Sequence, residues 1–485
     1  MLYRLSILIA LSFSLSTLAQ NHIDALRYSQ ESLWGSARYV SMGGAFGALG
    51  ADGSSASSNP AGIATFTTGQ FSASININEA RTDGSESKSS FGQKQSFAKK
   101  NSATIPNLNY ISANIFPPEI GADWDRLNFG IGYNKLADYN NRIYLEGSNS
   151  SNSLSTYILQ NSQGKTYDEL DILGQLAYMT YLTDTVGNEI TYNSPLDSLL
   201  NRTQTYKSNS SGGKNEFYLS FGTAYQNKLF IGMTLGFPSI EYREKNTISE
   251  TGFDSTIDPE SALESFDYTS NLNVEGSGIN LKLGLIYKID DAIRYGFALH
   301  TPTYYEIHEE YSSSMNTTFL SDSAYSSETY LGLFDYGLST PLKIINSLSF
   351  VIKKRAIISL EHEYLDYSNA NLNSDFYSFE NENNEINTVY ASTQNIKLGT
   401  EIRVHPQLSL RAGYAYFGSP FTDKYNLAST EFLNFGLGIK VNQYTFDLAL
   451  VNSYSQNEMS IYPNSEEVTI RNYGNQFLIS GGFKF

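Results

Sequence analysis

The stretch Ser41–Gly62 ("SMGGAFGALGADGSSASSNPAG") is the part of the chain whose residue types most suggest chemistry, because small residues dominate it. Glycine-rich loops that lead into a helix can hold a phosphate with their backbone N–H groups. Gly44, Gly47 and Gly50 fit neither G-x-G-x-x-G nor the Walker pattern, and no strand-like run precedes them. We therefore expect no nucleotide site here, and the role of the segment depends on the elements around it.

Other residues capable of chemistry are scattered. Five histidines are present (His22, His300, His308, His362 and His405), and carboxylates flank two of them in "EIHEEY" and "LEHEYLDY". Neighbouring side chains in a strand point to opposite faces, so Glu361 and His362 would diverge. No G-x-S-x-G motif occurs, and the absence of cysteine excludes thiol nucleophiles, thiolate metal sites and disulfides. We predict no catalytic residue, no metal site and no cofactor.

Charge and the first residues indicate where the protein works. The formal net charge of −17 disfavours nucleic acid as a partner. Residues 1–19 combine an early basic residue, an apolar run and small residues that end at Ala19. This pattern is typical of a secretory signal peptide, and the run is too short to span a bilayer as a helix. We expect an exported mature chain without a helical anchor.

A two-residue rhythm of apolar and polar side chains runs through most of the chain. It is clear in residues 71–78 ("FSASININ"), 127–134 ("LNFGIGYN") and 279–288 ("INLKLGLIYK"). Such alternation is the signature of strands, whose successive side chains face opposite sides. It predicts about fourteen strands, near 70–78, 107–116, 127–139, 215–226, 229–242, 278–289, 293–305, 342–352, 356–367, 394–404, 408–417, 432–442, 444–455 and 475–485.

The connections and the two strand faces distinguish between β architectures. Short turns alternate with long polar loops, the longest from about 140 to 214. One strand face is almost wholly apolar, with Ile131, Leu283 and Leu448 on it, whereas the other carries charges such as Lys282 and Arg411. A soluble β-sandwich also alternates, but it does not explain a charged face opposite an apolar one. An even number of strands with alternating short turns and long loops is typical of membrane barrels.

We therefore predict an all-β fold, a transmembrane antiparallel β-barrel of residues 70–485 in the outer membrane of a Gram-negative bacterium. Apolar side chains would face lipid, and polar ones would face the lumen. The chain ends on Phe485 after Phe483. This aromatic end resembles the carboxy-terminal signal by which the barrel-assembly machinery recognises outer-membrane proteins, so that machinery is an expected partner.

Residues 20–69 precede the first strand and cannot belong to the wall. A lumen enclosed by about fourteen strands is too wide for wall side chains to fill, and glycine and alanine permit close backbone approach. We expect these residues to form a hatch inside the barrel. Its Arg38 should pair with a wall carboxylate, since a partly buried unpaired guanidinium is costly; the candidates are Glu361, Glu363, Glu401 and Asp447. The alternative is a solvated Arg38 at the periplasmic mouth.

Residues 35–64 ("GSARYVSMGGAFGALGADGSSASSNPAGIA") resemble the hatch of the FadL/TodX-type outer-membrane transporters of long-chain fatty acids and other hydrophobic compounds. Asn59, Pro60 and Ala61 match the hatch tripeptide of that family, and they follow the paired glycines Gly43 and Gly44. Residues 276–307 and 336–372 resemble its middle strands. The resemblance covers nearly all of the mature chain.

The resemblance implies passive transport without a cofactor or an energy source. Members capture an apolar ligand at the extracellular loops and hold it in a lumen pocket against the hatch. They then release it sideways into the membrane lipid, through a gap at a kinked third strand. Here Gly130 and Gly132 mark that strand, either as the gap or as room for the hatch backbone. The resemblance does not identify the ligand-binding residues.

Two further readings of the function stay open at this point. One is a surface barrel that binds haem or another large apolar ligand, and the other is a general porin without a plug. In the long loop, Leu170, Leu173 and Ala177 recur at helical spacing. They predict an apolar helix that either receives a hydrophobic ligand or packs beneath the loop.

Overall fold

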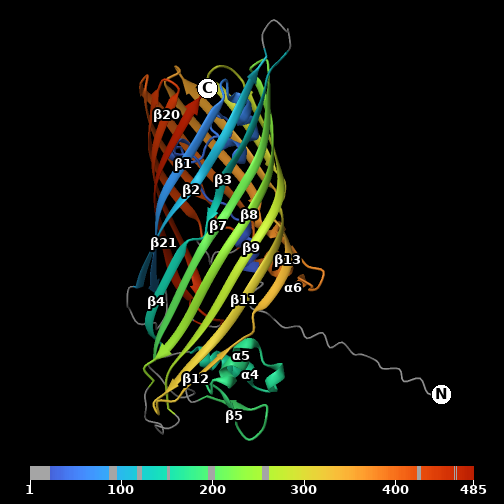
Figure 1. The fold of residues 1–485 in the computed structure, drawn as a ribbon, viewed down its shortest axis with the longest axis vertical. Helices are drawn as coiled ribbons and strands as arrows, with labels where there is room; N and C mark the ends of the chain where they lie inside the picture. Colours follow the sequence, from blue (N-terminus) through green and yellow to red (C-terminus); the bar gives the residue numbers. More distant parts are fainter. Residues whose placement is uncertain are drawn as a thin grey trace, which may run out of the picture.

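The computed structural model describes residues 22–86, 96–116, 123–149, 153–194, 202–253, 262–422, 428–463, 465 and 467–485. The expected signal peptide, residues 1–19, lies outside the described residues. The chain forms a closed antiparallel β-barrel (Figure 1). Closure is achieved by the first strand, β1 (Gln70–Glu86), which pairs with β2 (Ser96–Ile115) on one side and with the last strand, β21 (Glu467–Lys484), on the other.

Among the described residues, nineteen strands make up the barrel sheet, and interrupted strands join end to end into fourteen positions around the wall. The predicted fold class is thus confirmed. The remaining wall strands are β3 (Trp124–Asp138), β4 (Asn141–Asn149), β7 (Arg202–Tyr225), β8 (Leu229–Thr251), β9 (Leu263–Lys288), β10 (Ile293–His300), β11 (Tyr304–Phe319), β12 (Ala324–Glu328), β13 (Gly332–Ser339), β14 (Lys343–Ile352), β15 (Ala356–Asp366), β16 (Asn371–Asn373), β17 (Ser392–His405), β18 (Leu408–Phe417), β19 (Thr430–Val441) and β20 (Tyr444–Ser460).

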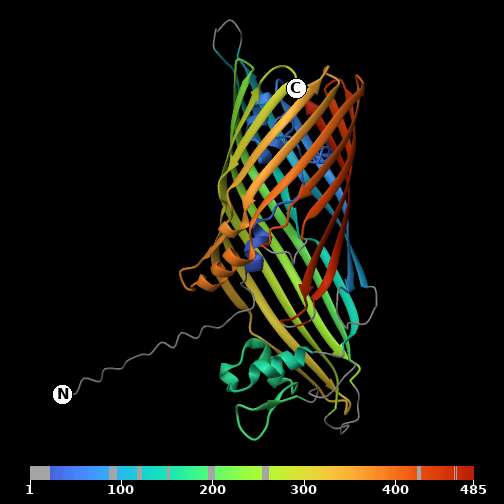
Figure 2. The ribbon, with the colours of Figure 1, turned by 180° about the vertical axis from the view of Figure 1, so that it is seen from behind.

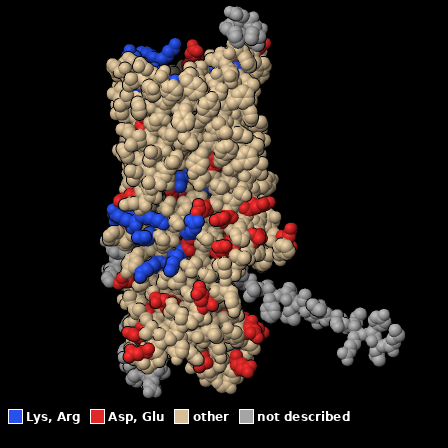
Figure 3. All heavy atoms as spheres, viewed as in Figure 1, with Lys and Arg blue, Asp and Glu red and all other residues tan. Residues whose placement is uncertain are grey.

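The predicted phase of the strands is correct. Ile131, Leu283 and Leu448 point outward and are about two-fifths exposed, at 42%, 42% and 38%. Their neighbour Lys282 points into the lumen and is 2% exposed. On the outer surface, side chains without charge dominate a broad band, and charged ones gather beyond it on the side of the long loops (Figure 3).

Several strands are much longer than the membrane requires. β7, β8 and β9 have 24, 23 and 26 residues, whereas about ten suffice for a tilted crossing. The extra length forms a collar beyond the apolar band. β4 and the first part of β7 belong to this collar and lie within the residues, 140–214, that the sequence predicted as one loop. The prediction failed there because the outer face of a collar strand is polar and its inner face is mixed, so the two-residue rhythm fades.

The segment before β1 lies inside the barrel, where its blue ribbon is surrounded by wall strands in both views (Figures 1 and 2). It contains α1 (His22–Ser29), α2 (Ala37–Ser41), α3 (Ser55–Ser58) and the 3₁₀ turn η1 (Pro60–Thr65). α2 begins at Ser36, whose side chain accepts a hydrogen bond from the backbone N–H of Tyr39. We refer to residues 22–69 as the hatch.

The extracellular side carries the other helices. The loop between β4 and β7 contains α4 (Leu154–Ser162), the 3₁₀ turn η3 (Tyr167–Glu169), α5 (Ile172–Met179) and the small strands β5 (Asp184–Thr185) and β6 (Tyr192–Asn193). The 3₁₀ turn η4 (Tyr367–Asn369) and α6 (Glu380–Val389) lie between β15 and β17. Within the described part of the chain, no helix has the length and apolar character needed to cross a membrane.

Candidate functional site

The hatch is seated on wall glycines that leave no room for a side chain. A methyl group added at Gly232 would overlap the carbonyl of Pro60, and one added at Gly284 would overlap the side chain of Asn59. The same holds for four more wall glycines, which face residues 42–48 of the hatch or its Ala64: Gly222, Gly296, Gly399 and Gly413. The small residues of the hatch therefore meet equally small positions in the wall, and backbone packs directly on backbone.

Asn59 connects the hatch both to itself and to the wall. Its side-chain amide donates to the carbonyl oxygens of Gly47 at 2.5 Å and Leu285 at 3.1 Å, and its Oδ1 accepts from the N–H of Ala61 at 3.1 Å. The side chain is fully buried. Pro60 starts the 3₁₀ turn η1 directly after it, where a missing N–H costs nothing. The amide thus links two hatch segments to β9.

Arg38 pairs with a wall carboxylate, as predicted from its position among small residues. Its Nε lies 3.0 Å from Oε2 of Glu401 on β17, and its Nη1 donates to the carbonyl of Ala51 at 3.1 Å. Arg411 also donates to Glu401 at 2.7 Å, and it bridges to Asp447 at 2.7 Å. The guanidinium groups of Arg38 and Arg411 and the carboxylates of Glu401 and Asp447 therefore form one cluster between hatch and wall. Its formal charges cancel.

Gly43 and Gly44 close the turn after α2. Their φ angles are +64° and +76°, which are strained for other residues but accessible to glycine. Any side chain at Gly43 would also meet the backbone of Tyr414 on β18. Gly43 and Gly44 therefore allow the hatch backbone to reverse direction at a point where it packs directly against the wall.

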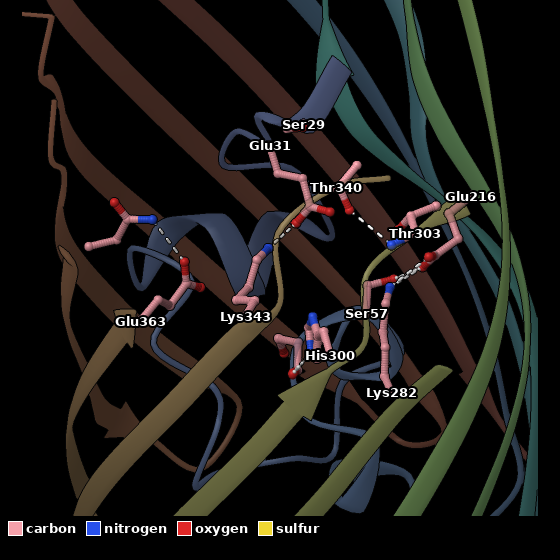
Figure 4. Close-up of polar contacts among 12 residues, drawn as sticks. Ser29, Glu31, Ser57, Glu216, Lys282, His300, Thr303, Thr340, Lys343 and Glu363 are labelled. Carbon is pink, nitrogen blue, oxygen red and sulfur yellow. Dashed lines mark hydrogen bonds and ion pairs between the residues drawn. The ribbon is translucent and has the colours of Figure 1, made fainter. Parts of the chain in front are cut away.

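A second polar network joins the hatch to the opposite part of the wall (Figure 4). Glu31 forms an ion pair with Lys343 on β14. Ser57 donates to Glu216 on β7 at 2.8 Å, and the same carboxylate holds Lys282 at 2.6 Å. Two ion pairs, Glu31–Lys343 and Glu216–Lys282, thus lie at the contact between hatch and wall, so the hatch is held by polar contacts as well as by packing.

Histidine and carboxylates also contact the hatch backbone from the wall. His300 Nε2 lies 2.8 Å from the carbonyl oxygen of Ser58, and Glu361 accepts from the N–H of Gly47 at 2.7 Å. Among the described residues, no group of three or more histidines and carboxylates is placed to hold a metal ion. These polar groups of the lumen therefore help to seat the hatch.

Gly130 and Gly132 lie in uninterrupted pairing on both sides. Gly130 is opposite Ile111 and Ser220, and Gly132 is opposite Asn109 and Tyr218. A methyl group at Gly132 would overlap the side chain of Asn109 and the hydroxyl of Tyr218, while one at Gly130 would have more room. The pairing of β3 breaks further along the same strand.

Between β2 and β3, the backbone pairing ends at Asn107 and Asn134. Just beyond, Pro106 has no N–H to donate, and Leu136 forms a bulge against β7. In the described ranges, residues 96–105 of β2 pair only with β1, and β4 pairs only with β7. We call this boundary the seam. The hatch meets its inner end, where the N–H of Ser32 donates to the carbonyl of Leu136 at 2.9 Å.

A cavity of about 270 Å³ lies at the extracellular mouth, between α1 of the hatch and the loop helices α4 and α5. Its apolar lining comes from distant segments: Leu154, Tyr157, Ile172, Leu173, Ile248, Leu272 and Ile461. Asp24 and Arg27 of α1 form its polar end, where they pair with each other. We call this the mouth cavity. The predicted helix of the long loop therefore lines a cavity through Leu173, while its Leu176 and Ala177 pack beneath the loop.

The family model for "Outer membrane protein transport protein (OMPP1/FadL/TodX)" matches residues 25–430. The chain belongs to this family. It is a transport protein of the outer membrane of Gram-negative bacteria and not an enzyme, and members of the family conduct hydrophobic compounds. No curated protein matches it significantly in sequence.

Solved structures of the same fold cover almost the whole chain. The toluene transporter TodX of Pseudomonas putida has a TM-score of 0.55 at 14% identity, covering 94% of this chain and 99% of its own. A FadL homologue of Pseudomonas aeruginosa has a TM-score of 0.53 at 12% identity, covering 94% and 100%. The monoaromatic hydrocarbon channel CymD has a TM-score of 0.52 at 12% identity, covering 93% and 98%. At such identities the likeness establishes the fold alone.

The tripeptide Asn59–Ala61 lies against Gly232 of β8 and Gly284 of β9 and not against β3. Sequence reasoning missed Glu31, Glu216 and Lys343, which form the second polar network. Glu216 and Lys343 lie at strand positions whose side chains face the lumen. The two-residue rhythm of their strands could have predicted that orientation. The mouth cavity as a whole was not predictable, because eight separate segments create it; only its loop helix left a local signal, through Leu173.

Proposed function

We propose that this chain takes up small hydrophobic molecules from outside the cell and that the mouth cavity is where they are first held. The observation that carries the proposal is this cavity, which is lined by apolar side chains of the loops and of the collar strands, together with polar ones such as Glu244 and Asn246, and which is bounded by α1 of the hatch. Apolar walls with a few polar groups are the usual character of a small-molecule site. Arg27 and Asp24 would orient a ligand that carries a polar end.

The size of the mouth cavity bears on the class of substrate. A cavity of about 150 Å³ lined by Leu, Ile and Phe already binds benzene. The 270 Å³ here suit a monoaromatic compound or a mid-length aliphatic chain better than an entire long-chain fatty acid. Two similar structures are described as a toluene transporter and a monoaromatic hydrocarbon channel. We therefore infer a compact hydrophobic substrate, with fatty acids as the alternative.

We further propose that the substrate leaves sideways through the seam and not through the hatch. The seam starts at Ile105, Pro106 and Leu136, and Ile105 is 57% exposed on the outer surface. Its neighbours on β1, Ile75 and Ile77, are 61% and 59% exposed, so this part of the wall belongs to the apolar band. Because an apolar group gains about 0.8 kcal/mol per CH₂ on leaving water, movement into lipid needs no other energy source.

A disulfide across the seam tests this route, since the native chain has no cysteine. The hydroxyl of Thr82 on β1 donates to Asn141 on β4 at 2.9 Å, so Thr82→Cys with Asn141→Cys joins the two sides of the seam. Oxidation should lower the uptake of radiolabelled toluene or decanoate into cells several-fold, because the seam can no longer widen. A reductant should restore uptake.

The matched control is Asn452→Cys with Asn475→Cys, a directly opposite pair in the continuous pairing of β20 and β21. Its oxidation should leave uptake unchanged. If the seam disulfide forms and uptake stays at the wild-type level, the lateral route is wrong. If the control disulfide also abolishes uptake, the lateral route is contradicted too. Such a result would show that any disulfide that stiffens the barrel wall lowers uptake.

A further inference from the structure

The outer surface of β7 and β8 changes character where the apolar band ends. On β8 the outward side chains Ile231, Met233 and Phe237 are apolar and about two-fifths exposed, at 39%, 41% and 38%. Ser239 and Glu241 follow, and Lys245 lies eight residues beyond Phe237. At about 3.3 Å per residue and a strand tilt near 40°, Lys245 stands roughly 20 Å above the apolar band.

Three exposed cations surround Asn209 at this height. Arg142 on β4 and Lys245 on β8 are the residues directly opposite Asn209, one on either side. Lys207 precedes Asn209 by two positions and faces the same way. Directly opposite residues have Cβ atoms about 5 Å apart, so all three cations can reach one anionic group above Asn209. We call Arg142, Lys207 and Lys245 the cationic patch.

The patch differs from the other exposed cations of the collar in having no acidic partner. Arg81 pairs with Asp83 at 2.8 Å, Lys99 with Glu79 at 3.2 Å, and Arg243 with Glu241 at 2.6 Å. Within the part of the chain that the structure describes, no carboxylate lies within ion-pair distance of Arg142, Lys207 or Lys245; Lys207 only approaches the ring of Tyr144, at 5.9 Å. Lys100 adds another positive charge, since its Nζ donates to Asn209 at 3.1 Å.

The patch also has a defined edge. On the next strands, Glu241, Glu275, His308 and Asp335 stand opposite one another in a row across β8, β9, β11 and β13. Figure 3 shows cations and carboxylates of this face gathered on separate sides of the collar. A protein with a net charge of −17 thus exposes a cluster of cations without acidic partners on this side of the collar. An anion there would be attracted by the patch and repelled by the neighbouring row.

We propose that the cationic patch binds the phosphorylated sugar headgroup of an outer-leaflet glycolipid. The outer leaflet of this membrane consists of lipopolysaccharide, whose core sugars carry anionic groups above the acyl chains. The height of the patch fits these core groups and not the lipid A phosphates, which lie next to the hydrocarbon. Arg142 offers a planar fork for a phosphate, while the two lysines add point charges.

The test compares Arg142→Gln/Lys207→Gln/Lys245→Gln with wild type, using fluorescently labelled rough lipopolysaccharide titrated into the purified barrel in neutral detergent. The variant should bind phosphorylated-core lipopolysaccharide at least about tenfold more weakly, because each surface cation contributes a factor of several. For the same glycolipid after dephosphorylation, the variant and the wild type should bind with equal affinity. The wild-type affinity should also fall with salt.

The matched control is Lys353→Gln/Lys354→Gln/Lys440→Gln, which removes the same charge from exposed positions at the opposite rim. The charge-conserving variant Arg142→Lys/Lys207→Arg/Lys245→Arg should retain most of the affinity. Heat-modifiable migration on gels verifies that each variant is folded.

Three results would overturn the proposal. One is equal binding by the patch variant and the control, and another is an equal loss of affinity for lipid A that has no core. The third is full competition by inorganic phosphate at the glycolipid concentration, which would assign the patch to a free anion.

Discussion

At the scale of single residues, the amide of Asn59 does most to fix the hatch, because it satisfies two carbonyls and one N–H at the contact between hatch and wall. Asn59→Ala would leave these groups without partners, at a cost of roughly 1–3 kcal/mol each. We expect a folded barrel whose hatch is loosened, with larger and more frequent conductance events in planar bilayers. Asn452→Ala, which loses one exposed hydrogen bond, should behave like wild type. Wild-type conductance of Asn59→Ala would contradict this role.

The sequence predicted such residue contacts only in part. An ion pair for Arg38 followed from the cost of burying a guanidinium, and the structure confirms Glu401 as the partner. Choosing among four wall carboxylates was impossible, since that choice depends on how the hatch is rotated within the barrel. The recognition of Phe485 by the assembly machinery stays a prediction; the residue is exposed and stacks on Tyr110 at 5.7 Å.

At the scale of elements, inward glycines of the wall strands decide how closely the hatch sits. Gly284→Ala would place a methyl group against the side chain of Asn59 and the N–H of Ala61. Such overpacking costs about 1–3 kcal/mol. We expect the hatch to become more sensitive to protease while the barrel still forms. Gly481→Ala makes the same change in β21, where a methyl group meets nothing within 4 Å, and should have no effect. Equal protease resistance in both variants would show that the hatch tolerates the extra volume.

Elements within the apolar band were predictable, because lipid on one side and the lumen on the other impose the two-residue rhythm. The collar was not, because water wets its outer face and the rhythm fades. The seam had one overlooked signal, a proline at position 106 next to the predicted strand 107–116. Its partner, the bulge at Leu136, depends on the register with β7 and leaves no trace in the sequence.

At the scale of the whole molecule, a closed wall surrounds a hatch, and a mouth cavity lies on the extracellular side of that hatch. The polar lumen by itself would favour ions, since Lys282, Arg411 and Glu401 all face inward. Their charges are balanced by one another and by the hatch. The hatch is therefore the element that separates a hydrophobic-compound channel from an ordinary pore.

Deleting residues 22–62, with the expected signal peptide retained, tests this separation. The barrel has its own closed pairing from β1 to β21 and should still insert. Removal of the hatch also removes Arg38 and Glu31, so wall charges such as Glu401 and Lys343 would face water. We expect a large, steady ion conductance and lower uptake of hydrophobic substrates, because nothing would direct them to the seam. Measured in planar bilayers and whole cells, unchanged conductance together with intact uptake would mean that the hatch neither seals the lumen nor guides the substrate.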